Sequence, residues 1–208
     1  AGLLEDLRRR DFTVNAMALT GEGEVIDPFG GREDLKGKRI RCVGEPAHRF
    51  SEDALRMLRA VRFAAQLGFE LEEGTAAALA RNAPFTARVS GERLKAELEK
   101  TLLSPAPEKV GEMVERGLLD HLYAFPRGVD WAVLADLPAA QVERWRGFCA
   151  LTGFPISALP VERKLRRGVE HPEAEIIPTL ALTAQDLMAL GLRGPAISAA
   201  QKKLALRV

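Results

Sequence analysis

Residues 51–63 read SEDALRMLRAVRF, and this stretch predicts a helix. Ser51 can cap its amino terminus, and the residues that follow are strong helix formers without Gly or Pro. On that helix Asp53 and Arg56 stand three residues apart on one face, and Glu52 lies four residues before Arg56. The sequence therefore predicts a carboxylate beside a guanidinium, one turn into a helix.

A carboxylate beside a guanidinium can select a nucleobase, because it offers one acceptor next to a fork of donors. Cytosine and adenine present an exocyclic amine beside a ring-nitrogen acceptor, whereas uracil and guanine present a carbonyl beside an N–H. A rigid Asp53–Arg56 pair would accept the first two bases, and a refused base would leave buried partners unpaired at about 1–3 kcal/mol each. Taken alone, such a pair is more often a solvated ion pair worth a few tenths of a kcal/mol.

Helices dominate the secondary structure that the sequence predicts. They are expected at residues 51–67, 73–83, 90–103 and 107–116, and then in shorter segments separated by prolines. Before them, the sequence predicts a helical or turn–helix piece at 4–19, one helical turn at 32–36, and short strands at 24–27 and 39–43. Residues 1–45 thus form a mixed α/β unit with too few strands to close a sheet.

Composition restricts the class of protein. A chain of 208 residues that is 47% apolar can bury a core for one domain or two. The formal net charge of +1 gives no global attraction to nucleic acid, so any polyanion site must be local. Cys42 and Cys149 lie far apart, and the three histidines are scattered, so neither predicts a metal site. Without a signal peptide or a membrane-length apolar run, a cytoplasmic setting is expected.

Three motifs occur in order: RRDFTVNAMA at residues 9–18, IDPFGG at residues 26–31, and SEDALRMLRAVRF at residues 51–63. Their order closely resembles the bacterial-type (class II) tRNA nucleotidyltransferases, the CCA-adding enzymes, and their poly(A) polymerase relatives. The similarity continues through GERLKAEL at residues 91–98, and a weaker similarity lies at residues 182–191. It covers residues 1–125 well and residues 126–178 hardly at all.

The resemblance implies a mostly α-helical fold in three parts. A small α/β head-domain remnant is expected at residues 1–48 and a helical neck and body at residues 49–125. A helical body and tail that binds tRNA is expected at residues 126–208. The implied activity is the addition of C and A to the 3′ end of tRNA without a nucleic-acid template, from CTP and ATP with Mg²⁺.

The resemblance also assigns roles to the residues of the motifs. Asp53 and Arg56 match the positions that touch the base, and Glu52 matches a residue that holds the Arg56 fork in place. The ribose and triphosphate positions correspond to Arg10, Asp11, Asn15, Arg59 and Arg62.

Other roles are open for some of these residues. A carboxylate such as Asp11 can accept from the 2′-OH that a deoxynucleotide lacks, whereas Arg10 could belong to a solvated basic run. Asn15 equally fits a cap or turn residue. Arg59 and Arg62 equally fit ion pairs that stabilise their helix.

The chain departs from the family at the metal site. In the family two Asp residues spaced Asp-x-Asp hold two Mg²⁺ ions, and this chain contains no such spacing. Asp27, Glu33 and Asp34 suit capping and solvation better than metal binding. We therefore expect no catalytic or metal-binding residue in this chain, and no nucleotide transfer by it alone.

The simplest account is that an amino-terminal catalytic segment is missing from this chain, and that segment is a possible partner. If its strands are absent, an apolar edge near Val25, Ile40 and Val43 is expected to be exposed.

Phosphate contacts need Lys and Arg side chains, and two basic stretches supply them late in the sequence. They contain Arg163, Lys164, Arg166 and Arg167, and Lys202 and Lys203 within a stretch that ends at Arg207. Each stretch equally fits a solvated face. Two other functions remain open: a poly(A) polymerase or an enzyme that adds only CC or only A, and a non-catalytic RNA-binding module.

Overall fold

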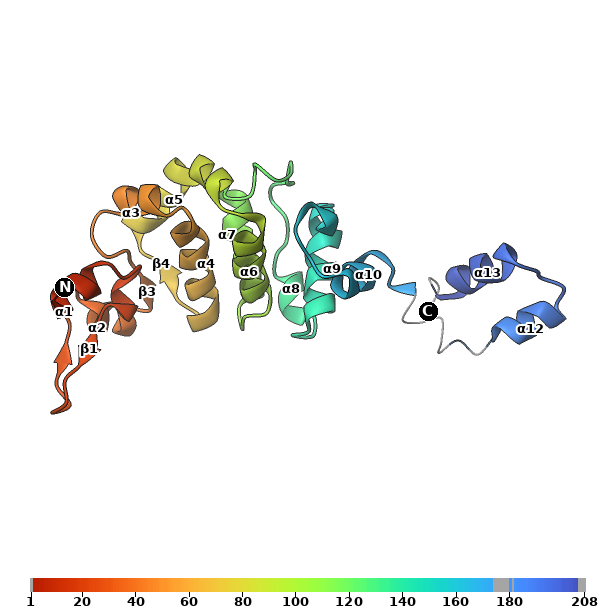
Figure 1. Ribbon diagram of the computed structural model, residues 1–208, viewed down its shortest axis with the longest axis horizontal. Coiled ribbons are helices and arrows are strands. Elements are labelled where there is room, and N and C mark those ends of the chain that lie inside the picture. The colour runs from red at the N-terminus through yellow and green to blue at the C-terminus, as the bar shows by residue number, and fades with distance from the viewer. Residues whose placement is uncertain (1, 174–179, 181, 206–208) are drawn as a thin grey trace. The chain divides into compact units, whose positions relative to one another are not determined.

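The computed structural model describes residues 2–173, 180 and 182–205. The chain divides into two compact units, residues 1–160 and residues 161–208, and each is described by itself. Helices form most of both units, which confirms the mostly α-helical fold (Figure 1). The domain boundaries expected at residues 48 and 125 stay predictions.

The amino-terminal segment combines short helices with a hairpin. α1 (Leu3–Arg8) precedes a 3₁₀ turn at Thr13–Asn15, and β1 (Ala18–Leu19) pairs antiparallel with β2 (Val25–Ile26). The helical piece predicted for residues 4–19 is therefore divided, because Phe12 forms an antiparallel bridge with Cys42. Cys42 is buried and Cys149 is half-buried.

α2 (Gly31–Lys36) is capped by a carboxylate, as the sequence predicted. Asp27 accepts the backbone N–H groups of Gly31 and Arg32 at 2.7 and 2.9 Å. A Cβ atom at Gly31 would lie 2.2 Å from the carbonyl oxygen of Thr13, so glycine is required at this close approach. Asp34 is 1% exposed, which corrects the expectation of a solvated carboxylate, because Arg39, Arg41 and the Thr13 hydroxyl all contact it.

β3 (Arg39–Ile40) pairs in parallel with β4 (Glu70–Leu71), a strand that the sequence did not predict. This pairing corrects the expected apolar edge. Ile40 is 0% exposed, because β4 and α4 (Leu55–Leu67) pack against β3; Val43 is 1% exposed, and of the three only Val25 is exposed, at 39%.

The helix predicted to begin at Ser51 is wrong at its start. α3 (Pro46–Glu52) contains Ser51, and α4 (Leu55–Leu67) begins after a break. Asp53 adopts an extended conformation there, with φ −147° and ψ 103°, and its carboxylate accepts the N–H of Leu55 at 3.1 Å. This local bond satisfies a free donor at the start of α4 and favours the break over a continuous helix.

The central helices pack through apolar stripes. α4 packs against α6 (Gly91–Leu102), and Leu58 and Val61 of α4 and Leu94 and Leu98 of α6 are 0% exposed. The predicted cap of α6 is confirmed, since the Ser90 hydroxyl accepts the N–H of Arg93 at 3.5 Å. The other elements here are α5 (Glu73–Asn82), α7 (Val110–Glu115), and 3₁₀ turns at Ala83–Arg88 and Pro107–Lys109.

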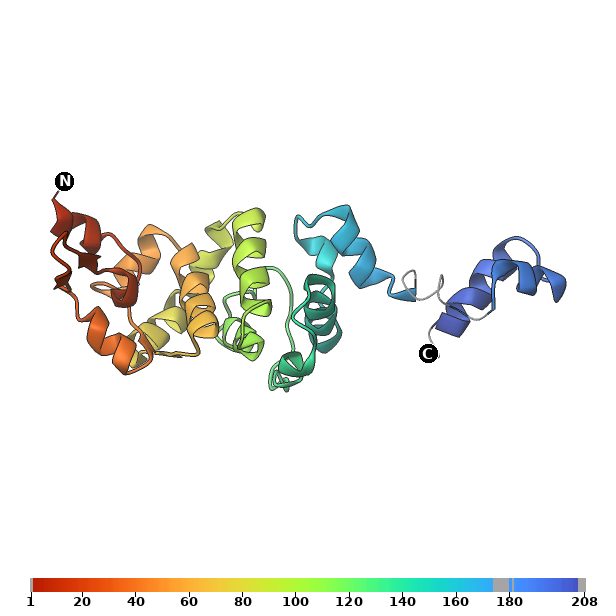
Figure 2. The same cartoon turned by 90° about the horizontal axis from the view of Figure 1, so that it is seen from below.

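The first unit ends in α8 (Val133–Asp136), α9 (Gln141–Thr152) and a 3₁₀ turn at Ile156–Ala158. Figures 1 and 2 show α4, α6 and α9 following one another side by side. Hydrogen bonds to one carboxylate link α9 to α6. Glu99 of α6 accepts from Trp145 Nε1 and Gln141 Nε2 of α9, each at 2.9 Å.

The second unit contains α10 (Arg163–Glu170), α12 (Ala184–Ala189) and α13 (Pro195–Ala205). Thr183 and Asp186 form a capping box at the start of α12. No helix within the described parts of the chain is both long and apolar enough to cross a membrane.

Candidate functional site

Two of the predicted motifs meet at the carboxylate of Asp11. Arg56 donates from Nε to Oδ1 of Asp11 at 3.2 Å, and Arg59 donates from Nε to Oδ2 at 2.6 Å. The side chains of Asp11 and Arg56 are each 15% exposed, so this ion pair is shielded from water. The backbone of Asp11 is also fixed, since its carbonyl oxygen accepts from Val43 N–H at 3.1 Å. Residues predicted to contact the ribose and the base are therefore physically joined.

Glu52 holds Arg56, as predicted. Its Oε2 accepts from Arg56 Nη1 at 2.6 Å and from Arg49 Nη1 at 2.5 Å. The hydrogen bond from Arg56, with the positive charges nearby, holds the pKa of Glu52 below its usual value. Arg56 is thus fixed at two nitrogens, Nε and Nη1, while Nη2 makes no hydrogen bond to the described residues.

Asp53 does not pair with Arg56, which corrects the adjacency expected from a continuous helix. The chain breaks between α3 and α4 at Asp53, whose carbonyl oxygen accepts the Arg56 N–H at 3.1 Å, and Asp53 Oδ2 accepts from Arg93 Nη2 at 2.9 Å. Asp53 is 37% exposed and Arg93 is 52% exposed, so this ion pair faces solvent. Sequence reasoning missed Arg93, which lies in the GERLKAEL motif but forty residues from its partner.

Arg62 is placed apart from this network. Its guanidinium pairs with Glu97 at 2.5 Å, with side chains 8% and 5% exposed, and donates to Gln66 at 2.6 Å. It also lies 3.8 Å from the centre of the Phe63 ring. These contacts favour the ion-pair alternative for Arg62.

The remaining predicted residues of the sugar motif have local partners. Asn15 Oδ1 accepts the N–H of Phe12 at 3.2 Å and closes the 3₁₀ turn, which favours the cap or turn alternative. Arg10 is 53% exposed and pairs with Asp6 at 2.9 Å, while its carbonyl oxygen accepts from Arg49.

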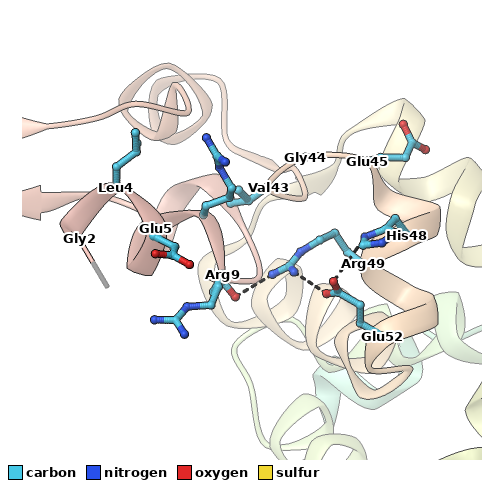
Figure 3. A pocket seen from close by; sticks show the side chains of 11 residues that line it. Gly2, Leu4, Glu5, Arg9, Val43, Gly44, Glu45, His48, Arg49 and Glu52 are labelled. Atoms are coloured by element: carbon cyan, nitrogen blue, oxygen red, sulfur yellow. Dashed lines mark hydrogen bonds and ion pairs between the residues drawn. The ribbon is translucent and has the colours of Figure 1, made fainter.

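A hollow of about 650 Å³ lies beside the network, between α1 and α3 (Figure 3). Its lining includes Arg8, Arg9, His48, Arg49 and Glu52. Figure 3 shows the Arg49 guanidinium between the carbonyl oxygen of Arg9 and the carboxylate of Glu52. Sequence reasoning missed Arg49 as well, although it precedes Glu52 by three residues and shares its helix.

The carboxylates near this network do not fit Mg²⁺. Both oxygens of Asp11 accept from arginines, and Glu52 and Asp53 also pair with arginines. Within the described residues, no group of three or more His, Cys, Asp and Glu side chains could hold a metal ion.

The predicted RNA-binding residues lie in the second unit. Arg163, Lys164, Arg166 and Arg167 are exposed on α10, opposite the buried Leu165, and three of them border a hollow of about 470 Å³. Arg166 pairs with Glu170 at 3.0 Å.

On α13, Lys202 pairs with Glu173 at 3.3 Å and Lys203 is exposed. Arg207 lies outside the described residues.

Two family models match the chain. The poly A polymerase head domain matches residues 1–41, and the probable RNA- and SrmB-binding site of polymerase A matches residues 68–127. The CCA-adding enzyme of Geobacillus thermodenitrificans (strain NG80-2) is 44% identical over 187 residues, which are 86% of this chain and 46% of that enzyme. That of Geobacillus sp. (strain WCH70) is 52% identical over 121 residues, 58% of this chain and 30% of the relative. The chain thus spans less than half the length of these relatives.

Solved structures agree with the family models. The Bacillus stearothermophilus CCA-adding enzyme in complex with CTP matches 99% of this chain and 55% of its own, with a TM-score of 0.76 and 36% identity. The Thermotoga maritima CCA-adding enzyme in complex with tRNA matches 98% of this chain and 57% of its own, with a TM-score of 0.62 and 26% identity. Together with the joined motifs, these likenesses show that the chain belongs to the tRNA nucleotidyltransferase and poly(A) polymerase family.

Proposed function

We propose that residues 1–208 are the nucleotide-selecting and tRNA-binding portion of a CCA tRNA nucleotidyltransferase, which adds C and A to the 3′ end of tRNA without a nucleic-acid template. The observation that carries this proposal is the ion pair that joins Arg56 to Asp11. It brings a base-selecting side chain and a ribose-selecting side chain into one shielded network, and a relative of the same fold is named as a complex with CTP.

Base selection rests on Arg56 and Asp53. Arg56 is held at Nε and Nη1, which leaves Nη2 to donate to the ring nitrogen of cytosine or adenine. Asp53 keeps unused acceptor capacity beside its bonds to Leu55 and Arg93, so it can accept from the exocyclic amine once a base is bound. Uracil and guanine present the reverse order, and Arg56 would meet a second donor.

Sugar selection rests on Asp11. Oδ2 of Asp11 lies against both Nε and Nη2 of Arg59, whereas Oδ1 accepts only from Arg56 and retains a lone pair, so Oδ1 can accept from a ribose 2′-OH. Arg59 and Arg10 are the cations that we assign to the triphosphate. Asn15 orders the turn that follows Asp11, and Arg62 stabilises α4.

We assign no reaction step to a metal on this chain. The carboxylates of Asp11, Glu52 and Asp53 pair with arginines, so Mg²⁺ would be held by carboxylates outside residues 1–208. The chain by itself is then expected to transfer no nucleotide. A cytoplasmic setting is part of the same proposal, and it fits a buried Cys42, whose burial raises the pKa of the thiol to about 12 and keeps it unreactive.

tRNA binding is assigned to the basic face of α10 and to Lys202 and Lys203. The exposed arginines of α10 border a hollow wide enough for a phosphate group, and a relative is named as a complex with tRNA.

Nucleotide titration of this chain tests the proposal. CTP and ATP are expected to bind at least about tenfold more tightly than UTP and GTP, since a refused base leaves polar partners unpaired. A second assay incubates the chain with tRNA, CTP, ATP and Mg²⁺, and extended tRNA would contradict the assignment of the metal to other residues. Equal affinity for all four nucleotides would overturn the proposed base selection.

A poly(A) polymerase is the second candidate, because both matching family models carry that name. The same titration separates the two, since a poly(A) polymerase site would bind ATP and not CTP. Binding of RNA without any nucleotide would instead support a non-catalytic RNA-binding module.

A further inference from the structure

Arg49 connects the segment that carries Asp11 to the helix that carries Glu52, and the proposed function requires a fixed distance between these two segments. Its Nη2 donates to the carbonyl oxygens of Arg9 and Arg10 at 2.7 and 2.9 Å, and its Nη1 donates to Glu52 at 2.5 Å (Figure 3). Its own carbonyl oxygen accepts from Arg56 Nη1 at 2.9 Å. Arg49 therefore contacts the backbone that precedes Asp11, the Glu52 carboxylate that holds Arg56, and Arg56 itself.

These contacts close a ring. From Arg49 the hydrogen bonds run through Glu52 to Arg56, and from Arg56 to Asp11. The covalent chain then leads from Asp11 back to Arg10, whose carbonyl oxygen Arg49 holds. A displacement of the ribose-selecting segment must therefore displace the base-selecting arginine or break one of these bonds.

We propose that Arg49 is a positioning residue that couples sugar selection to base selection. The inference rests on the proposed function, and it concerns a residue that touches neither the base nor the ribose. Arg49 acts by fixing the distance between Asp11 and Arg56, each of which contacts its own part of the nucleotide.

The chemistry of arginine suits this role and that of lysine does not. The planar fork reaches the two carbonyl oxygens with one nitrogen and Glu52 with the other, whereas a lysine ammonium is a single point charge. The Arg49 side chain is only 11% exposed. Its Nε is buried without a hydrogen-bond partner among the described residues, so the rest of the guanidinium carries the contacts.

The test measures two affinity ratios on the chain, with Kd values from calorimetric titration. The base ratio is Kd for UTP over Kd for CTP, and the sugar ratio is Kd for dCTP over Kd for CTP. In Arg49→Met both ratios are expected to fall together by about tenfold. Without Arg49 the positions of Asp11 and Arg56 are less fixed, so the site discriminates less between bases and between sugars. Asp11→Asn serves as the reference and is expected to lower the sugar ratio more than the base ratio.

Arg8→Met is the matched control. Arg8 lines the same hollow and is exposed, so the variant removes an equal charge and leaves the ring intact. Both ratios are expected to stay within about twofold of wild type in this variant. Arg49→Lys keeps the charge and the aliphatic stem, which protects folding, and is still expected to lower both ratios because one ammonium cannot reach both segments.

The outcomes separate the inference from the proposed function. If wild type discriminates and Arg49→Met or Arg49→Lys keeps both ratios, the coupling is overturned and the proposed function stands. If only one ratio falls in these variants, the coupling is also overturned. If wild type itself shows no base discrimination, the proposed function fails and this inference fails with it.

Discussion

Arg56 donates from Nε to Oδ1 of Asp11 at 3.2 Å, although the two residues lie forty-five positions apart in the sequence. The bond makes the orientation of the guanidinium that we propose selects the base depend on the segment that we propose selects the sugar. In nucleotide recognition such a bond reduces the number of arrangements that the site can adopt before its ligand arrives, and preorganisation of this kind favours affinity.

Replacing Asp53 by Asn should change which bases the site prefers. An amide offers both an acceptor and two donors, so Asp53→Asn can turn a donor toward the carbonyl of uracil, which the carboxylate refuses. We expect the ratio of Kd for UTP to Kd for CTP to fall by about tenfold, with both values measured by titration of the chain. Asp136→Asn, a carboxylate remote from the network, is the control. An unchanged ratio in Asp53→Asn would remove Asp53 from base selection.

Removing the Arg93 side chain should affect base selection more than the free energy of unfolding. Its ion pair with Asp53 is exposed, and exposed pairs contribute about 0–1 kcal/mol to the free energy of unfolding. Arg93→Met is expected to widen the range of Asp53 orientations and to lower the UTP-to-CTP ratio of Kd by about threefold.

Arg127→Met is the matched control for Arg93, because Arg127 forms a similarly exposed ion pair with Asp120 at 2.6 Å. The two variants should have similar denaturant midpoints, and only Arg93→Met should change the ratio. An equal effect of both variants on the ratio would show that Arg93 has no specific role.

The buried pair of Arg62 and Glu97 should matter to stability. Removing one partner leaves a charge without compensation in a site that is 5% to 8% exposed, which costs about 3–5 kcal/mol. Urea unfolding of Arg62→Met is expected to show a loss of this order, reduced by Lys100, whose Nζ lies 3.6 Å from Glu97. Arg62→Met/Glu97→Leu should recover part of it. A loss below about 1 kcal/mol, the usual range of an exposed pair, would contradict this role.

The sequence predicted the parts of the fold that depend on local signals. The caps at Asp27 and Ser90 are confirmed because each needs only a polar side chain beside the start of a helix. Burial of Ile40 was missed because its partner strand, Glu70–Leu71, has two residues and no pattern of its own. Such a strand is fixed by tertiary pairing, which a reading of local propensity does not include.

The site shows the same division between local and distant contacts. The contact of Glu52 with Arg56, four residues apart, was expected from their spacing and occurs across the break between α3 and α4. The expected ion pair of Asp53 with Arg56 on one continuous helix did not occur, because a side chain-to-backbone bond at Leu55 competed with helix continuity. The contact between Asp53 and Arg93 spans forty residues, so only the packing of α4 on α6 could place it.

tRNA binding by the second unit should depend strongly on salt. Each phosphate contact releases counterions, so log Kobs falls linearly with log salt concentration, with about one unit of slope for each contact. Arg163→Gln and Arg167→Gln are each expected to reduce the slope by about one unit and to weaken binding to all tRNA sequences alike. Arg127→Gln, in the first unit, is the control. A slope unchanged in all variants would place the phosphate contacts elsewhere on the chain.

The contact between α6 and α9 should make stability depend on pH. Burial would raise the pKa of Glu99, but hydrogen bonds from Trp145, Gln141 and Lys95 outweigh it and hold the pKa below the ordinary value of 4.5. A carboxyl group with a lowered pKa in the folded state contributes stability that is present above pH 4.5 and is lost as the pH falls through the folded-state value.

Glu99→Gln should therefore be less stable than wild type at pH 7 and should lose less stability between pH 5 and pH 3, a window set by the lowered pKa of Glu99. The measurement is the free energy of unfolding in urea at several pH values, followed by tryptophan fluorescence, since Trp145 is buried beside Glu99. Glu22→Gln, an exposed residue in the turn between β1 and β2, controls for the loss of one negative charge. If the wild-type and Glu99→Gln curves ran parallel through the acid range, the carboxylate would not be what fastens α9 to α6.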